Sequence, residues 1–201
     1  MKIVEKDNRK NIIQTAIGLF EKKGLAEVSL NEVIKTSGLS KGTFYHYFKN
    51  KEELTEACLL DFWEKQAEGW QNFPFESISV KEAMDFLKGE YVRFFRDYNN
   101  KEDKSFEFYS NTLFSAQKYP QVHYTIKKFF ADYIKGFTTT IERDQQQGIL
   151  RNDIPAGIMA HQILSTTEGF AIIAANDFYE EPASLLESIF ENLYKSMTHE
   201  N

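Results

Sequence analysis

The sequence has little cysteine and no long hydrophobic run. A single cysteine, Cys58, cannot form a disulfide within the chain or a zinc site made of cysteines, and this fits a reducing compartment. The longest uninterrupted apolar run covers residues 170–175, far short of the roughly 20 residues that cross a bilayer. The charged first twenty residues leave no room for the apolar centre of a signal peptide. We therefore expect a cytoplasmic protein without a membrane partner.

The sequence also lacks the motifs of common enzyme sites. It contains no H-E-x-x-H, G-x-S-x-G, C-x-x-C, G-x-G-x-x-G or P-loop pattern, and only four histidines. We therefore expect no enzymatic activity, no bound metal and no cofactor. One alternative stays open, in which His161 and Glu168 form a catalytic pair.

No segment alternates apolar and polar residues in the manner of a half-buried strand, whereas helical periodicity recurs throughout the chain. The four prolines fall between the periodic segments, where a fixed φ and a missing amide are tolerated. The pattern predicts an all-α fold of about nine helices. Their expected ranges are 8–23, 30–37, 41–48, 51–72, 79–98, 103–118, 121–147, 155–176 and 183–198.

Charge is unevenly distributed along the chain. The net charge of −6 argues at first against nucleic acid, because phosphate contacts require positive side chains. Residues 1–50, however, hold nine Lys or Arg against five acidic residues, so this segment is +4 and the remainder is −10. A basic amino-terminal segment before an acidic body is typical of a protein with one DNA-facing end.

Local signals divide the basic segment into short helices. Ser29 and Glu32 have the S-x-x-E spacing of a capping box, which predicts a helix that begins there. That helix is expected to end at a Ser37-Gly38 turn, and Ser40 is expected to cap the next one. The basic segment is therefore expected to hold two short helices on either side of a glycine turn.

The helix after this cap has one apolar and one polar face. At about 100° per residue, Phe44 and Phe48 share a face that is expected to be buried. Gly42 and His46 point away from it, and the tyrosines and threonine around them can bond base edges or phosphates. Asn50 is expected to cap the helix that follows.

The combined pattern is more specific than its parts. Taken singly, these features also fit a corner of a helical bundle with aromatic core residues and solvated lysines. Together, the capping box, the glycine turn, the second cap and the run S-K-G-T-F-Y-H-Y-F-K-N-K-E-E-L over residues 40–54 resemble the tetracycline-repressor (TetR) family of bacterial regulators. The resemblance covers residues 12–59.

This resemblance implies an all-helical homodimer with two domains in each chain. The first, residues 1–50, would be a helix-turn-helix DNA-binding domain, and the second, residues 51–201, a helical ligand-binding and dimerisation domain. The implied partners are a double-stranded DNA operator, a second copy of the chain and a small-molecule effector. The positions that contact DNA in the family fall here on Ser29, Asn31, Lys41, Gly42, Thr43, Tyr45, His46, Tyr47 and Lys51.

The clearest polar feature of the body lies on the helix expected at 155–176. His161, Ser165 and Glu168 have the i, i+4, i+7 spacing that places side chains on one helix face, among mostly apolar neighbours. Two interpretations stay open: the strip contacts a polar ligand or a metal, or it is a polar strip against solvent or in a dimer interface. Further candidate ligand contacts are Tyr109, Leu113, Asn111 and His123.

The last two helices carry the expected dimer interface, because members of the family pair these helices between two copies. Small residues on the first helix permit close approach, and the second has an apolar stripe. The candidate interface residues are Gly169, Ala171, Ala175, Leu186, Ile189, Phe190 and Leu193.

These expectations combine into one functional hypothesis. A homodimer binds a palindromic operator and represses transcription, and a small-molecule effector releases it. Activation or corepression fits the same residues. A helical adaptor that binds proteins without DNA is an alternative that fits the acidic total charge.

Overall fold

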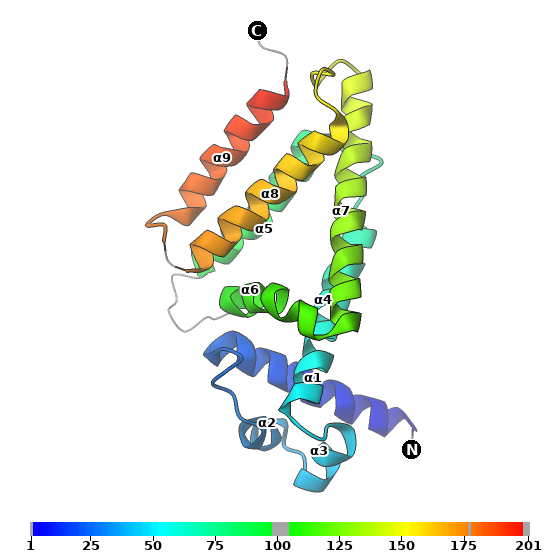
Figure 1. Cartoon of the computed structure of the whole chain (residues 1–201), viewed down its shortest axis with the longest axis vertical. Helices are drawn as coiled ribbons and strands as arrows, with labels where there is room; N and C mark the ends of the chain where they lie inside the picture. The colour runs from blue at the N-terminus through cyan, green and yellow to red at the C-terminus, as the bar shows by residue number, and fades with distance from the viewer. Residues whose placement is uncertain (1, 98–104, 177, 199–201) are drawn as a thin grey trace. The chain divides into compact units, whose positions relative to one another are not determined.

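The computed structural model describes residues 2–97, 105–176 and 178–198 (Figure 1). It describes only the backbone at residues 2–7, 94, 96, 97, 105, 106 and 175. Within these ranges every regular element is helical, which confirms the predicted all-α fold. None of these helices is long and apolar enough to cross a membrane. The elements are α1 (Lys2–Lys23), α2 (Leu30–Ser37), α3 (Lys41–Tyr47), α4 (Lys51–Gln71), α5 (Val80–Asp97), α6 (Ser105–Ser115), the 3₁₀ turn η1 (Ala116–Lys118), α7 (Pro120–Gln146), α8 (Ala156–Ala175) and α9 (Pro182–Met197).

The prolines stand where the sequence predicts them, at helix starts and between helices. Pro120 is the first residue of α7, Pro182 is the first residue of α9, and Pro155 is the N-cap of α8. The first residues of a helix have no carbonyl within the helix to bond, so the missing N–H of proline costs nothing there.

Two helix boundaries differ from those predicted. α1 begins at Lys2 rather than near residue 8, and no proline or glycine interrupts the chain between these points. α6 ends at Ser115 and passes into η1 instead of continuing to residue 118, a tightening that is common at helix ends. The helix end predicted at residue 98 and the start predicted at residue 103 lie outside the described residues.

The described chain forms two compact units, each built from separate stretches of sequence. Unit 1 comprises residues 2–67 and 105–127, and unit 2 comprises residues 68–97, 128–176 and 178–198. Unit 1 therefore holds α1, α2, α3, most of α4, α6 and η1, and unit 2 holds α5, most of α7, α8 and α9. The functional division expected at residue 50 stays a prediction.

Aromatic side chains form the core of unit 1. The ring of Phe20 on α1 stacks on Phe108 of α6 with the centroids 5.8 Å apart, and Phe62 of α4 meets Phe108 edge-on at 5.4 Å. The buried Trp63 indole donates a hydrogen bond to Thr112 Oγ1 at 3.0 Å, so its polar atom is satisfied. α6 is thereby packed against both α1 and α4 within this unit.

In unit 2, the segment between α4 and α5 is fixed to α7. The Arg143 guanidinium donates to the carbonyl oxygens of Phe75 and Ile78, and the buried Asp144 carboxylate accepts from the Val80 amide at 2.8 Å. Backbone polar groups in such a segment need partners when they leave water. The last turn of α7 supplies them and so positions the start of α5.

α9 packs on α5 within unit 2, and Figure 1 shows the course of both helices. Leu186 and Phe190 are 0% and 3% exposed, and Ala171 of α8 is also buried. Their surfaces are covered within the chain, and the dimer interface predicted for these residues stays a prediction. Of the other candidates, Gly169, Ile189 and Leu193 are partly exposed, and the side chain of Ala175 lies outside the described residues.

Candidate nucleic-acid interface

Local sequence shapes the turn between α2 and α3. Gly38 has a φ of 71°, a left-handed conformation that costs residues other than glycine roughly 1–2 kcal/mol. α3 then begins at the predicted cap, where Ser40 Oγ accepts from the Thr43 amide at 3.0 Å. The turn and the cap together fix the direction in which α3 leaves α2.

The capping box predicted for α2 is only half formed. Ser29 Oγ accepts from the Glu32 amide at 3.2 Å, as expected. The Glu32 carboxylate pairs instead with Lys23, near the end of α1, at 2.5 Å, and this contact lowers the pKa of Glu32. The reason is that an ammonium group is a stronger partner for a carboxylate than the Ser29 amide. The glutamate therefore ties α2 to α1.

α3 is held by two buried rings and exposes the opposite face. Phe44 and Phe48 are 0% and 1% exposed, in agreement with the predicted apolar face. Tyr45 is 48% exposed, and Gly42 and His46 are exposed as well. The side of α3 expected to read DNA is therefore accessible, while its contact with DNA stays a prediction.

The other candidate DNA contacts on α2 and α3 surround this face. The Thr43 hydroxyl lies 2.9 Å from Ser40 Oγ and is part of the cap, and the rings of His46 and Tyr47 meet edge-on at 4.9 Å. These contacts restrict the rotamers of the side chains before any ligand binds. Ser29, Asn31 and Lys41 are exposed, and Thr43 and Tyr47 are partly exposed.

α4 begins at Lys51, four residues after the end of α3. Asn50 Oδ1 accepts from the Glu53 amide at 2.8 Å, and the Glu53 carboxylate accepts from the Lys49 amide at 2.8 Å, so the predicted cap is formed. Lys51 Nζ donates to the carbonyl oxygen of Ala26 at 3.1 Å. An ammonium has three donors, so two are left for a phosphate.

Sequence reasoning missed Arg9 as a candidate contact. Its guanidinium carbon lies 5.3 Å from the centroid of the Phe48 ring, and the side chain is otherwise exposed. α1 thus holds a cation against the residue that follows α3. The only signal in the sequence was the basic charge of the first helix, which does not show which cation reaches α3.

The polar strip predicted on α8 is divided between solvent and the interior of unit 2. His161 and Ser165 are exposed, and His161 Nδ1 donates to the Gly157 carbonyl at 2.7 Å. Glu168 is partly buried and accepts from the Tyr91 hydroxyl at 2.9 Å. This pairing of α5 with α8 was not apparent from the sequence, and a ligand role for the strip stays a prediction.

Three further ligand candidates lie on α6 in unit 1, whereas the strip on α8 belongs to unit 2. Tyr109 and Leu113 are partly buried, and the Tyr109 ring lies 5.5 Å from Trp63 and 6.3 Å from Phe62. Aromatic packing therefore accounts for Tyr109 without a ligand. Asn111, on the same helix, lines a pocket of unit 1.

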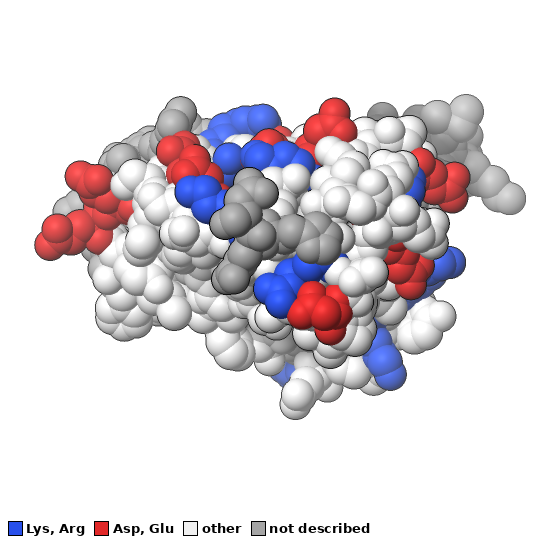
Figure 2. Space-filling view, turned by 90° about the horizontal axis from the view of Figure 1, so that it is seen from above, with Lys and Arg blue, Asp and Glu red and all other residues white. Residues whose placement is uncertain are grey.

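Surface charge on the described residues is mixed. On the face shown in Figure 2, acidic and basic side chains are interspersed. Exposed pairs such as Lys81 with Asp85 at 2.7 Å neutralise one another and add little stability.

Among the residues that the structure describes, no three His, Cys, Asp or Glu side chains lie close enough to hold a metal ion.

Comparison with known proteins identifies the amino-terminal segment. Residues 12–58 match the family model of bacterial regulatory proteins, tetR family. The HTH-type transcriptional regulator YerO of Bacillus subtilis is 31% identical over 97 residues, which are 48% of this chain and 33% of YerO. The HTH-type transcriptional repressor NemR of Escherichia coli strain K12 is 38% identical over 58 residues, 29% of each chain. The chain therefore spans about a third or less of the curated relatives it matches.

Solved structures share the fold over nearly the whole chain. A TetR-family transcriptional regulator from Cytophaga hutchinsonii superposes with a TM-score of 0.71 at 18% identity, covering 98% of both chains. The reduced form of E. coli NemR gives a TM-score of 0.64 at 15% identity, covering 92% of this chain and 96% of NemR. At these identities the likeness shows the fold.

The exposed α3, its capped turn and the matching family model define a helix-turn-helix domain in the amino-terminal segment. Over residues 12–58, this domain is similar to that of bacterial regulatory proteins of the tetR family.

Proposed function

We propose that the chain is a transcriptional repressor that binds a palindromic operator as a homodimer and is released by a small-molecule effector. The observation that carries this proposal is the exposed face of α3, with Gly42, Tyr45 and His46, mounted on the buried rings of Phe44 and Phe48. It lies inside the segment that matches the family model. A helix with this division of faces suits the major groove, which admits one helix.

Each exposed group has a chemical role in this proposal. Gly42 lets the backbone approach DNA closely, Tyr45 donates to a phosphate, and His46 faces base edges. Lys51 at the start of α4 and Arg9 against the Phe48 ring supply positive charge, and phosphate contacts of this kind give most of the affinity.

The dimer is proposed to use the surface of α8 and α9 that unit 2 leaves exposed. Ile158 and Ile173 on α8 are 53% and 41% exposed, and helical spacing places His161 and Ser165 on the same face. This favours the interface alternative for the polar strip. Two-fold pairing of this surface would present two copies of α3 to the half-sites of a palindrome.

The effector is proposed to bind within the second domain. FadR of Bacillus subtilis, with a TM-score of 0.59 and 17% identity over 94% of this chain and 98% of FadR, was solved in complex with stearoyl-CoA. A fold of this kind can thus hold a small molecule. In this chain, the Tyr91 hydroxyl bonded to Glu168 places polar groups among the apolar residues of unit 2.

Selection of bound sequences from random double-stranded DNA tests the proposal. We expect the full chain to enrich one inverted repeat, and the affinity for it to fall steeply with salt, because phosphate contacts release counterions. A chain carrying both Tyr45→Ala and His46→Ala serves as the control and should enrich nothing. Failure of the unaltered chain to enrich any sequence at low salt would contradict the proposal.

A further inference from the structure

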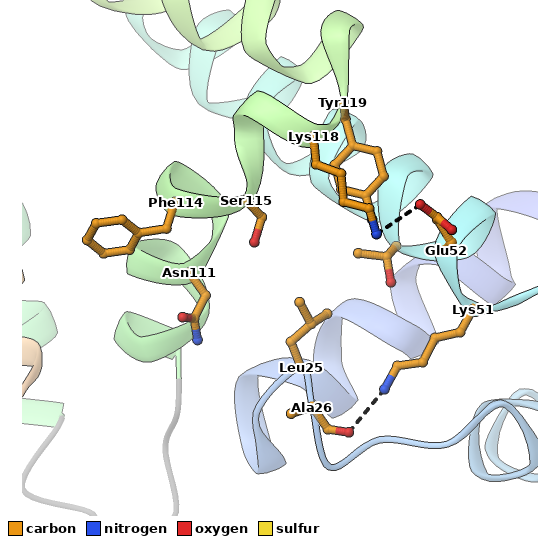
Figure 3. Close-up of a pocket in the computed structure, with 10 residues that line it drawn as sticks. Leu25, Ala26, Lys51, Glu52, Asn111, Phe114, Ser115, Lys118 and Tyr119 are labelled. Carbon is orange, nitrogen blue, oxygen red and sulfur yellow. Dashed lines mark hydrogen bonds and ion pairs between the residues drawn. The ribbon is translucent and has the colours of Figure 1, made fainter.

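A pocket of about 690 Å³ lies within unit 1 (Figure 3). Its walls come from the turn after α1, the start of α4 and the end of α6 with η1. The volume falls in the range of small-molecule sites, roughly 300–1,000 Å³. Lys51 is the only lining residue that also belongs to the proposed DNA interface.

The pocket combines apolar walls with polar groups that have no partner. Leu25 lies on one side, and Phe114 at the rim is 71% exposed, a large apolar surface left in water. Asn111 and Ser115 lie one turn apart on α6 and line the opposite wall (Figure 3). Neither side chain has a hydrogen-bond partner among the described residues. A ligand with both apolar and polar parts would match these walls.

The charged groups of the lining leave one ammonium unneutralised. Lys118 pairs with Glu52 at 2.9 Å, and this contact raises the pKa of Lys118. Lys51 donates to the Ala26 carbonyl, a neutral acceptor, and has no carboxylate partner among the described residues. Two lysines against one glutamate give the lining a charge of +1. The site is therefore electrostatically suited to an anion.

We infer that this pocket binds a small organic carboxylic acid and that its binding opposes DNA binding. The carboxylate would accept from Lys51, while the hydrocarbon or aromatic part would cover Leu25 and Phe114. Lys51 is also the proposed phosphate contact, and a carboxylate that takes both of its remaining donors leaves none for the phosphate, so the two anions compete. Such competition is reciprocal, since each ligand lowers the affinity for the other by the same factor. The regulatory half of this inference rests on the proposed function, and the binding half does not.

Calorimetric titration of the full chain without DNA tests the site. The probes are phenylacetate and hexanoate, each compared with its neutral amide. We expect at least one acid to bind at least about tenfold more tightly than its amide. Lys51→Met should remove this preference, because it keeps the aliphatic side chain and deletes the charge.

A second pair of variants separates this pocket from the rest of the surface. Ser115→Trp fills the pocket and should abolish acid binding, whereas Thr139→Trp, at an exposed position on α7 in unit 2, should not. Circular dichroism checks that each variant folds. If Ser115→Trp does not fold, Lys51→Met tests the site in its place. Equal affinity for acid and amide, binding that survives both pocket variants, or no binding of either acid at millimolar concentration overturns the site.

The competition is tested separately by DNA titration at matched ionic strength. The acid that binds should lower DNA affinity in the unaltered chain and have no effect in Ser115→Trp. Unchanged DNA affinity with the acid bound overturns the competition. If the chain fails to bind DNA even without acid, the proposed function fails, while the calorimetric result still decides the pocket.

Discussion

Adjacent residues on α3 have opposite roles because burial separates them. Phe44 is fully buried and its ring lies 6.0 Å from that of Phe48, whereas Tyr45 is half exposed and meets the Phe44 ring only with its edge. Removal of a buried ring leaves a cavity, but removal of an exposed ring does not. The stability of the domain and its recognition of DNA can therefore be separated by mutation.

Tyr45→Ala is expected to weaken DNA binding about tenfold and to change the free energy of unfolding by less than about 1 kcal/mol. Phe44→Ala should cost about 3–5 kcal/mol of stability. Urea unfolding followed by circular dichroism, together with fluorescence anisotropy on labelled DNA, measures both effects. A similar loss of stability in the two variants would show that the faces of α3 are assigned wrongly.

Cys58 is expected to be unreactive in the folded protein. Burial raises the pKa of its thiol, and the reactive form of cysteine is the thiolate. An aromatic disulfide reagent at pH 8 should label Cys58 only as the chain unfolds. Because the unfolded thiol ionises near pH ~8.5 and the folded one does not, stability should fall as pH rises above this value. Rapid labelling of the native protein would contradict the burial of this side chain.

At the scale of elements, α3 is short and depends on its ends. It has seven residues, fewer than an isolated helix needs for stability in water. The Ser40 cap satisfies the Thr43 amide, and Gly38 sets the preceding turn. Changes at these two positions should therefore alter the recognition helix as a whole, although neither residue lies on its exposed face.

Ser40→Ala is expected to cost about 1 kcal/mol, and Ser40→Gly only a few tenths, because glycine is the better cap of the two. Urea unfolding of the two variants measures this difference. Amide hydrogen exchange should show faster opening of α3 in Ser40→Ala, with α5 as an internal reference. Equal stability of the alanine and glycine variants would show that the cap contributes nothing.

Local signals in the sequence were enough to predict where helices begin, but they did not predict the contacts between helices. Ser40 and Asn50 form the predicted caps, because a cap depends on residues three positions apart. The apolar stripe of α9 was recognised, but periodicity does not say what covers it, and Leu186 is buried within the chain. The contact of Arg9 with Phe48 joins residues far apart in sequence, so no local pattern reveals it.

At the scale of the whole molecule, exposed apolar residues on α8 require an explanation. Ile158 and Ile173 lie on one face of this helix and are about half exposed. Leu186 and Phe190 of α9 are buried, so they are not part of this exposed surface. A second copy of the chain would remove this exposed apolar surface from water.

Ile173→Glu is expected to convert the proposed dimer into a monomer and to leave the helix content unchanged, because two copies of the chain would then each bring a buried charge to the proposed interface. Ile149→Glu, at a position 43% exposed outside α8 and α9, is the matched control and should remain dimeric. Light scattering after size-exclusion chromatography measures both masses. A dimeric Ile173→Glu variant would place the interface elsewhere.

The anchoring of α3 by Phe44 and Phe48 also makes its operator preference transferable. Positions 42, 45 and 46 face solvent, so side chains from another regulator can replace them without disturbing the interior. If the proposed effector binds, a chimaera of this kind would respond to it at a foreign promoter, which would connect a new chemical signal to an existing gene.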